Sequence, residues 1–156
     1  MANFNEHALE MSIMELLKDE GYTYVSGDQI HRERTEVLLT DDLKQYLYNR
    51  YAADGLTPSE VESIILMLRN ISGTIYEANK AVLKLLCDGF IFNREDRTQK
   101  DLYIELIDFD TPENNIFKAV NQFEIEGINN QLRIPDGIVF VNGIPVVVFE
   151  FKSAVK

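Results

Sequence analysis

The stretch LRIPDGIVFVNGIPVVVFEFKSAVK, residues 132–156, decides the fold. Two apolar and largely β-branched runs, DGIVFV and IPVVVFEFK, flank an Asn-Gly pair, which is the strongest short signal for a β-hairpin. Such an apolar hairpin is expected in the interior of a sheet. Asp136 stands at its start, and Glu150 and Lys152 stand near its end. The sequence therefore predicts a buried hairpin that carries two carboxylates and an amine at one end.

The register of this hairpin decides whether the two acids can meet. With a strict two-residue turn, Asp136 lies opposite Phe149, and Glu150 points to the other face of the sheet, because a slip of one residue reverses every side chain. With a three-residue turn or a glycine bulge, Val141 faces Pro145 instead, and Asp136 lies opposite Glu150. Both faces are apolar, so the pattern permits both registers. A functional site requires the second.

Two carboxylates on opposed strands, about 5 Å apart at Cβ, repel each other unless a cation lies between them. Magnesium typically takes one or two carboxylates together with waters and substrate phosphate. Lys152 points to the same face as Glu150, and its ammonium can orient or deprotonate a water and stabilise charge on a phosphate. This set would hydrolyse a phosphodiester. The structural alternative is a turn at Pro135-Asp136 and a solvated strand end with a weak ion pair.

Outward from the hairpin, the rest of the chain predicts helices first and strands later. Helical patterns cover residues 4–22, 40–55, 57–70 and 74–89, and a short strand pattern covers residues 22–27. The third and fourth helices begin with capping boxes, Thr57 with Glu60 and Thr74 with Glu77. Strand patterns cover residues 90–93, 101–109 and 116–127. This order predicts an α/β or α+β fold with an antiparallel or mixed sheet.

Composition limits the class of protein. The 156 residues suffice for one domain with a hydrophobic core. A net charge of −11 disfavours a free-standing nucleic-acid binder, so any DNA contact needs a local basic patch or a partner. The apolar runs are too short to span a membrane, and no signal peptide is expected. The one cysteine fits a reducing cytoplasm.

The spacing of PDG and EFK, with 13 residues between Asp136 and Glu150, resembles the PD-(D/E)xK nuclease signature. Three longer blocks, residues 21–39, 106–127 and 133–153, resemble in this order the N-terminal region of the restriction (R) subunit of type I restriction-modification enzymes. The resemblance implies a restriction-endonuclease-like mixed sheet flanked by helices, with an additional helical insertion. It implies that residues 1–156 form a single nuclease domain at the head of a much larger chain, without the C-terminal part of the nuclease core.

The resemblance also implies an activity, which is Mg²⁺-dependent or Mn²⁺-dependent cleavage of double-stranded DNA by a metal-activated water. The cleavage would belong to an ATP-dependent enzyme with methyltransferase and specificity subunits, and ATP would bind to a downstream motor and not to this fragment. The fragment alone is expected to be inactive or weak. Two alternatives stay open. One is a non-catalytic docking domain of the same assembly, and the other is a repair or junction nuclease of the same superfamily.

The resemblance assigns roles to individual residues. Asp136 and Glu150 match the metal-binding acids, joined by the backbone carbonyl of Phe151, and Lys152 matches the catalytic lysine. A glutamate on the first helix would add a ligand, with Glu10 as the first candidate and Glu6 as the second; a solvated helix face is the alternative for both. The candidates for phosphate contact are Arg133, just ahead of the site, and three residues of the HRER segment, His31, Arg32 and Arg34. The alternative for HRER is a solvated turn.

Overall fold

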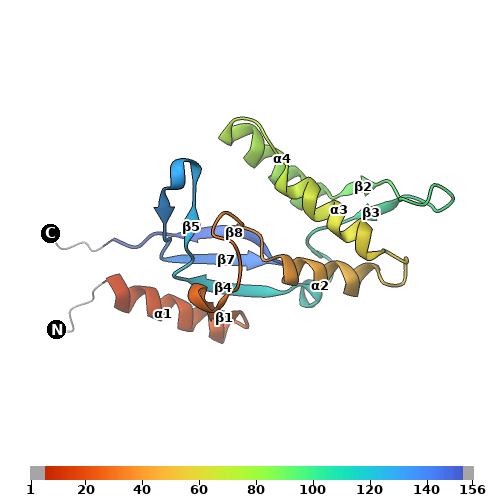
Figure 1. The fold of residues 1–156 in the computed structure, drawn as a ribbon. Helices are drawn as coiled ribbons and strands as arrows, with labels where there is room; N and C mark the ends of the chain where they lie inside the picture. Colours follow the sequence, from red (N-terminus) through yellow and green to blue (C-terminus); the bar gives the residue numbers. More distant parts are fainter. Residues whose placement is uncertain (1–5, 153–156) are drawn as a thin grey trace. The chain divides into compact units, whose positions relative to one another are not determined.

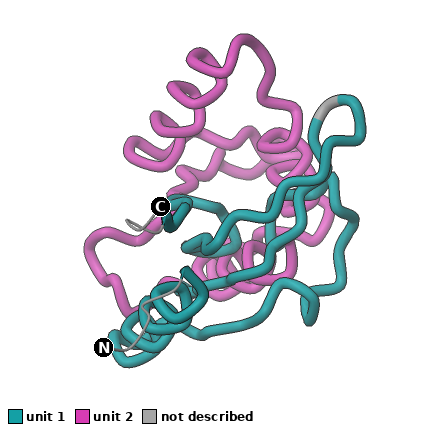
Figure 2. The backbone as a smooth tube through the Cα atoms, turned by 90° about the vertical axis from the view of Figure 1, so that its left-hand side faces the viewer, with its two compact units in different colours: residues 1–39, 116–156 teal, residues 40–115 magenta. Residues whose placement is uncertain are grey.

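The computed structural model describes residues 6–152 and divides them into two compact units (Figures 1 and 2). Unit 1 contains residues 6–39 and 116–152, and unit 2 contains residues 40–115. Unit 2 is therefore inserted into the chain of unit 1, and most of its residues that lie in regular structure are helical. The predicted mixed α/β class with an additional helical insertion is confirmed.

Unit 1 is built from one long helix, one main sheet and a small hairpin. Its elements are α1 (Glu6–Asp19), β1 (Thr23–Ser26), the 3-10 turn η1 (Gly27–Gln29), β4 (Phe117–Asn121), β5 (Ile125–Glu126), the 3-10 turn η3 (Ile128–Asn130), β6 (Leu132–Arg133), β7 (Gly137–Val141) and β8 (Ile144–Phe149). The main sheet has the strand order β1-β4-β7-β8. β1 pairs with β4 in parallel and the other two pairs are antiparallel, so the sheet is mixed.

The two faces of this sheet are covered differently. On one face, Ile138 and Phe140 of β7 form a hydrophobic cluster with Leu39, Val120 and Phe123. Because side chains alternate along a strand, Val139, which lies between Ile138 and Phe140 in β7, faces the other side of the sheet. That side belongs to α1, which packs on β1 and β4. The face with Ile138 and Phe140 is called the cluster face below.

Helix α1 approaches the sheet closely where β7 begins. A Cβ atom built on Gly137 would lie 2.4 Å from the Cε atom of Met14, which is buried in α1. The missing side chain at Gly137 therefore lets α1 pack on the end of β7 that follows Asp136. The same helix carries Glu10 one turn before Met14, so Glu10 also faces this end of the sheet.

The predicted burial of the whole hairpin is confirmed for β7 and wrong for β8. Every residue of β7 is buried. In β8, Val146, Val147 and Val148 are 39%, 43% and 59% exposed. The reason is topological, because β8 is the last strand of the described sheet and pairs with β7 alone there.

Unit 2 consists of three helices, a short hairpin and a 3-10 turn. These elements are α2 (Thr40–Tyr51), α3 (Pro58–Arg69), α4 (Ile75–Asp88), β2 (Phe90–Phe92), β3 (Leu102–Ile104) and η2 (Pro112–Asn114). β2 and β3 are antiparallel, as the sequence predicts. Both predicted capping boxes are present, at Thr57 with Glu60 and at Thr74 with Glu77.

A buried ion pair connects α3 to the β2–β3 hairpin within unit 2. Glu60 accepts a hydrogen bond from Nε of Arg94 at 2.8 Å, and Arg94 also donates to the carbonyl oxygens of Asp54 and Gly55. Burial opposes the ionisation of Glu60, but hydrogen bonds from Arg94, Thr57 and Glu95 outweigh it and lower its pKa to about 2. Glu60 is therefore a structural carboxylate.

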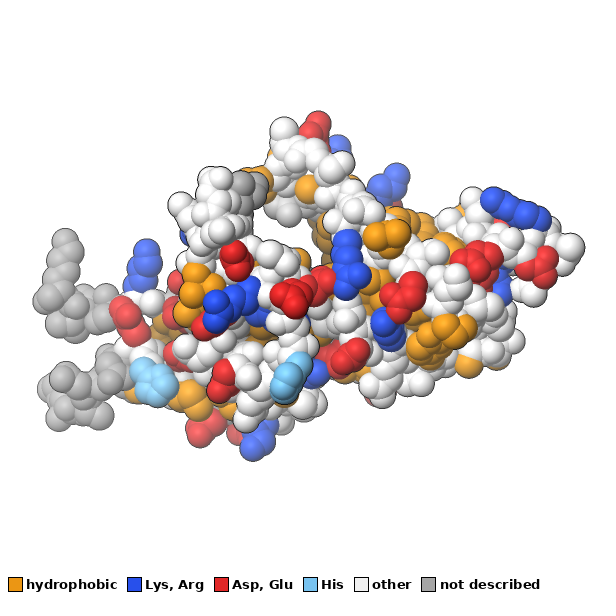
Figure 3. All heavy atoms as spheres, in the orientation of Figure 1, with side chains coloured by type: hydrophobic (Ala, Val, Ile, Leu, Met, Phe, Trp, Pro, Cys, Tyr) orange, Lys and Arg blue, Asp and Glu red, His pale blue; other side chains and the backbone are white. Residues whose placement is uncertain are grey.

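Charge is spread over the surface. On the face drawn in Figure 3, acidic and basic side chains of the described residues are interspersed and form no continuous basic patch. Among residues 6–152, no helix is both long and apolar enough to cross a membrane.

We expect Gly27→Ala to destabilise the chain, because Gly27 lies directly against the backbone that follows β4. An added Cβ would lie 2.3 Å from the carbonyl oxygen of Gln122 and 2.7 Å from Cα of Phe123, and neither atom can rotate aside. The midpoint of thermal unfolding, followed by circular dichroism, should fall by several degrees.

Gly127→Ala is the matched control, because the nearest atom to its added Cβ is the carbonyl oxygen of Gln131 at 3.7 Å. This variant should unfold close to the parental temperature. A Gly27→Ala protein as stable as the control would contradict the close approach of the two segments.

Candidate active site

A β-bulge sets the register at the end of the hairpin. Near the turn, Val141 pairs with Ile144, so the Asn142-Gly143 loop is a true two-residue turn. Further along, Val139 pairs with Val147 and Gly137 with Phe149, which leaves Val146 as an extra residue in β8. The pattern therefore combines a two-residue turn with a bulge. The predicted pairing of Val141 with Pro145 is wrong, because the extra residue is Val146 in the strand and not a residue of the turn. The predicted register of Asp136 opposite Glu150 is nevertheless reached, because Gly137 pairs with Phe149.

This register places Asp136 across from Glu150, since both lie one residue beyond the last pair. Oδ2 of Asp136 accepts a hydrogen bond from the backbone N–H of Phe151 at 2.5 Å, which ties the acid to the EFK segment. The rings of Phe149 and Phe151 stack with their centroids 5.8 Å apart, so these two side chains share one side of the segment. By alternation, Glu150 and Lys152 lie on the other side, together with Asp136.

The carboxylates are accessible to a ligand. Asp136 is half-buried, whereas Glu150 and Lys152 are exposed. Within residues 6–152, no group of three or more histidine, cysteine, aspartate or glutamate side chains is arranged to hold a metal ion. The candidate donors at this position are the carboxylates of Asp136 and Glu150, and the predicted third donor is the carbonyl of Phe151. Such oxygen ligands suit Mg²⁺, which commonly binds through one or two carboxylates and keeps several waters.

Glu10 is buried and hydrogen-bonded, so the solvated alternative for it is wrong. It is 5% exposed, and its Oε1 accepts hydrogen bonds from Nδ2 of Asn121 at 2.7 Å and Nε2 of Gln122 at 3.2 Å. Nδ1 of His7 lies 3.7 Å from its Oε2. Glu6, the second candidate, is exposed. The structure therefore holds Glu10 at the end of β4, outside any group of three ligating side chains in the described chain.

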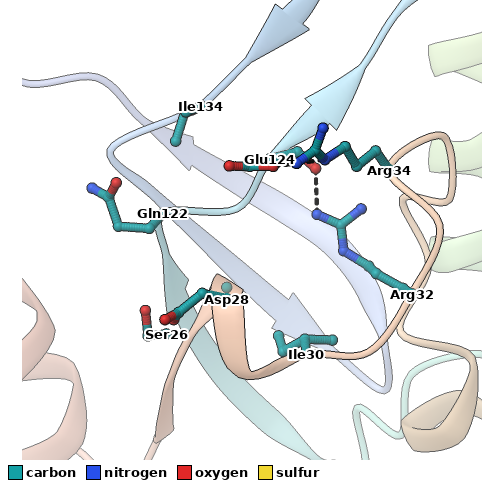
Figure 4. Close-up of a pocket in the computed structure, with 9 residues that line it drawn as sticks. Ser26, Asp28, Ile30, Arg32, Arg34, Gln122, Glu124 and Ile134 are labelled. Carbon is teal, nitrogen blue, oxygen red and sulfur yellow. Dashed lines mark hydrogen bonds and ion pairs between the residues drawn. The ribbon is translucent and has the colours of Figure 1, made fainter.

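Arg32 holds the HRER segment against the sheet. Its guanidinium lies over the ring of Phe123, 3.4 Å from the centroid. It donates hydrogen bonds to three backbone carbonyl oxygens, those of Glu33, Glu36 and Glu124. Figure 4 shows the contact with Glu124. Burial lowers the pKa of Arg32, and the carboxylates of Glu124 and Glu36 oppose this shift. The guanidinium thus fixes the loop through its backbone contacts.

The other candidates for phosphate contact are exposed. Arg34 pairs with Glu124 through Nε at 2.7 Å, and their side chains are 59% and 40% exposed. His31 is exposed as well. Arg133 is exposed in β6, where it pairs with Ile125 of β5. HRER is therefore neither a free turn nor a uniform basic patch, because its first arginine is structural and its second is accessible.

The polar partners of Glu10 are residues that sequence reasoning missed. Asn121 is 4% exposed, and its Oδ1 accepts a hydrogen bond from the hydroxyl of Tyr24 at 3.0 Å. Gln122 has a φ of 52°, a left-handed conformation that is unusual for this residue type. The signal in the sequence was the Asn-Gln pair that follows Ala119 and Val120, since a buried polar residue such as Asn121 needs hydrogen-bond partners.

The chain is similar in sequence to one protein family and to several known proteins. A family model described as "Type I restriction enzyme R protein N terminus" matches residues 3–156. A protein of Methanocaldococcus jannaschii, assigned as a type I restriction enzyme MjaIXP endonuclease subunit, is 32% identical over 97% of this chain and 16% of its own length. The type I restriction enzyme HindI endonuclease subunit of Haemophilus influenzae is 32% identical over 97% of this chain and 15% of its own length.

A third relative is the type I restriction enzyme SsaAORF53P endonuclease subunit of Staphylococcus saprophyticus. It is 28% identical over 95% of this chain and 15% of its own length. The chain thus spans 15–16% of the length of these relatives.

We expect the chain to bind Mn²⁺ weakly, and Asp136→Ala to reduce the affinity about tenfold or more, because one of two carboxylate ligands is lost. Isothermal titration calorimetry measures this directly. Asp110→Ala removes the same charge from an exposed position of unit 2 and is the matched control. Identical titrations of the Asp136 variant and the parent would remove Asp136 from the metal centre.

We expect the two arginines of HRER to differ in their effect on stability. Arg32→Ala should lower the melting temperature by several degrees, because three carbonyl oxygens lose their donor and Phe123 loses its cation. Arg34→Ala should change the melting temperature little, because exposed ion pairs contribute little to stability. Equal melting temperatures for the two variants would contradict the structural role of Arg32.

Proposed function

Because the chain belongs to the family of type I restriction enzyme R protein N termini, we propose that it is the endonuclease part of such a subunit. The substrate would be double-stranded DNA, cleaved with Mg²⁺ by hydrolysis of a phosphodiester. The chain would act within a larger ATP-dependent enzyme that also contains methyltransferase and specificity subunits. ATP would be used by a motor in another part of the R subunit.

The observation that carries the proposal is the bulge at Val146. Without it, Asp136 would lie across from Phe149, and the acids would point to opposite faces of the sheet. With it, Asp136, Glu150 and Lys152 share one side at the end of an apolar hairpin. A structural hairpin gains nothing from bringing two carboxylates together, because like charges across a strand pair are destabilising. A site that binds a cation does gain from this arrangement, because both carboxylates can be ligands of the cation.

The three residues would divide the chemistry. Asp136, Glu150 and the carbonyl of Phe151 would hold Mg²⁺, which when bound supplies a Lewis acid that polarises the phosphoryl oxygens. The hydrogen bond that Asp136 accepts from the backbone N–H of Phe151 orients this carboxylate before any ligand arrives. The ammonium of Lys152 would donate to the phosphate and stabilise the negative charge that gathers on it in the transition state.

The acidity of the chain is compatible with this function inside a larger enzyme. With a net charge of −11, the chain would gain little affinity from long-range attraction to DNA. Other parts of the enzyme would therefore bring DNA to the site. This explains why the isolated chain should cleave DNA poorly.

We expect Lys152→Ala to abolish DNA cleavage by the assembled enzyme with ATP and Mg²⁺, while ATP hydrolysis continues. Loss of one group that stabilises the transition state costs on the order of 10²–10³ in rate. Lys152 is exposed beyond the end of β8, so the melting temperature should stay close to that of the parent. Cleavage is measured by linearisation of a circular DNA that carries the recognition site, and ATP hydrolysis by phosphate release.

Lys100→Ala removes the same charge from an exposed position of unit 2 and should leave both activities at parental rates. If Lys152→Ala cleaves DNA as fast as this control, the acids and the lysine only brace the assembly, and the chain is a docking domain.

A further inference from the structure

Unit 1 contains a cavity of about 520 Å³ that the proposed chemistry does not use (Figure 4). Its wall comes from the segment after β1, the HRER loop, the segment after β4 and the residue before Pro135. Pockets of about 300–1,000 Å³ are typical of sites for small organic ligands. The cavity is therefore large enough for one nucleotide unit.

The cavity adjoins the candidate active site. Ile134, which lines it, lies two residues before Asp136. Gln122, which follows the last residue of β4, also lines it, and Nε2 of its side chain donates a hydrogen bond to Glu10. The cavity also lies on the cluster face, because Ile30 lines it and packs against the hydrophobic cluster. By alternation Asp136 points to the same face.

The two ends of the cavity differ in chemistry. Figure 4 shows the guanidinium groups of Arg32 and Arg34 on one side and Gln122 on the opposite side, with Ser26 and Asp28 below. A cationic side suits a phosphate group. Amide and carboxylate groups suit the hydrogen-bonding edge of a nucleobase, which carries both donors and acceptors.

The cationic side can accept a phosphate without unfolding its surroundings. The Arg34 pair with Glu124 is solvent-exposed, and such pairs contribute little to stability, so a phosphate oxygen can replace the carboxylate. Arg32 remains in place through its backbone contacts, and its buried Nε has no hydrogen-bond partner in the described structure. Arg32 thus supplies a fixed positive charge, and Arg34 an exchangeable one.

We propose that this cavity is a subsite for one nucleotide of the DNA strand, next to the phosphodiester that is cut. Arg34 would bind the phosphate of that nucleotide in place of Glu124, and Gln122 and Asp28 would contact the base. This inference rests on the proposed nuclease function. It adds a contact that positions the strand, since Ile134 in the wall of the cavity lies two residues before Asp136.

The test is a titration of the ¹⁵N-labelled chain with a trideoxynucleotide that carries no terminal phosphate, in EDTA so that no metal centre is needed. Saturable shifts should appear at the backbone amides of Gly27, Gln122 and Glu124, which border the cavity. Arg34→Ala should weaken binding about tenfold or more, because a charge-assisted hydrogen bond is lost. Arg34→Lys, which keeps the charge, should retain most of the affinity.

Arg97→Ala is the matched control, because it removes the same charge from an exposed position of unit 2. Its affinity for the trideoxynucleotide should equal that of the parent. If the three amides do not shift, or if Arg34→Ala binds as tightly as Arg97→Ala, the subsite is refuted. If a free mononucleotide binds more than tenfold tighter than the trideoxynucleotide, the cavity serves free nucleotides and the assignment to a DNA strand is refuted.

These outcomes are independent of the cleavage assay. Loss of cleavage in Lys152→Ala without shifts around the cavity refutes the subsite alone. Retained cleavage in Lys152→Ala together with the expected shifts refutes the nuclease assignment and leaves a nucleotide-binding chain.

Discussion

The arrangement of the site depends on one extra residue in a strand. Side chains on a β-strand alternate with a period of two, so the insertion of Val146 into β8 exchanges the faces of every residue that follows it. The turn at Asn142-Gly143 is fixed independently. Asn142 is buried, its backbone N–H donates to the carbonyl of Ile116, and its Oδ1 accepts from the N–H of Ile116. With the turn fixed, the bulge alone determines which face receives Glu150 and Lys152.

The sequence was sufficient where structure follows from local chemistry. Capping boxes need two residues at a fixed spacing, and the Asn-Gly turn needs positive φ at both positions, which Asn142 and Gly143 adopt at 51° and 78°. The position of the bulge was not predictable from sequence. Val146 is one of three consecutive valines, and identical side chains give no signal for which of them is the extra residue. The parallel pairing of β1 with β4 was equally hidden, since it joins segments that unit 2 separates.

The site residues also divide into those that local sequence could predict and those that depend on long-range contacts. Asp136, Glu150 and Lys152 could be proposed because their spacing along one hairpin is a local property. The burial of Glu10 and the backbone contacts of Arg32 depend on segments about ninety or more residues away, such as Asn121 and Glu124. A solvated face and a basic turn were reasonable interpretations of these two residues from composition alone. Long-range contacts gave both of them fixed partners, and they left Arg34 accessible.

The exposed valines of β8 have a consequence for the behaviour of the chain in solution. Within residues 6–152, β8 is the border strand of the main sheet. An apolar strand in that place offers unpaired backbone groups to a second molecule, and a segment such as IPVVVF has the composition of aggregating β-structure. Pro145 at one end of this strand cannot donate a hydrogen bond, and Glu150 and Lys152 place charges at the other end. The residues proposed for catalysis would therefore also act as gatekeepers that keep the strand of a neighbouring molecule from pairing with the edge of β8.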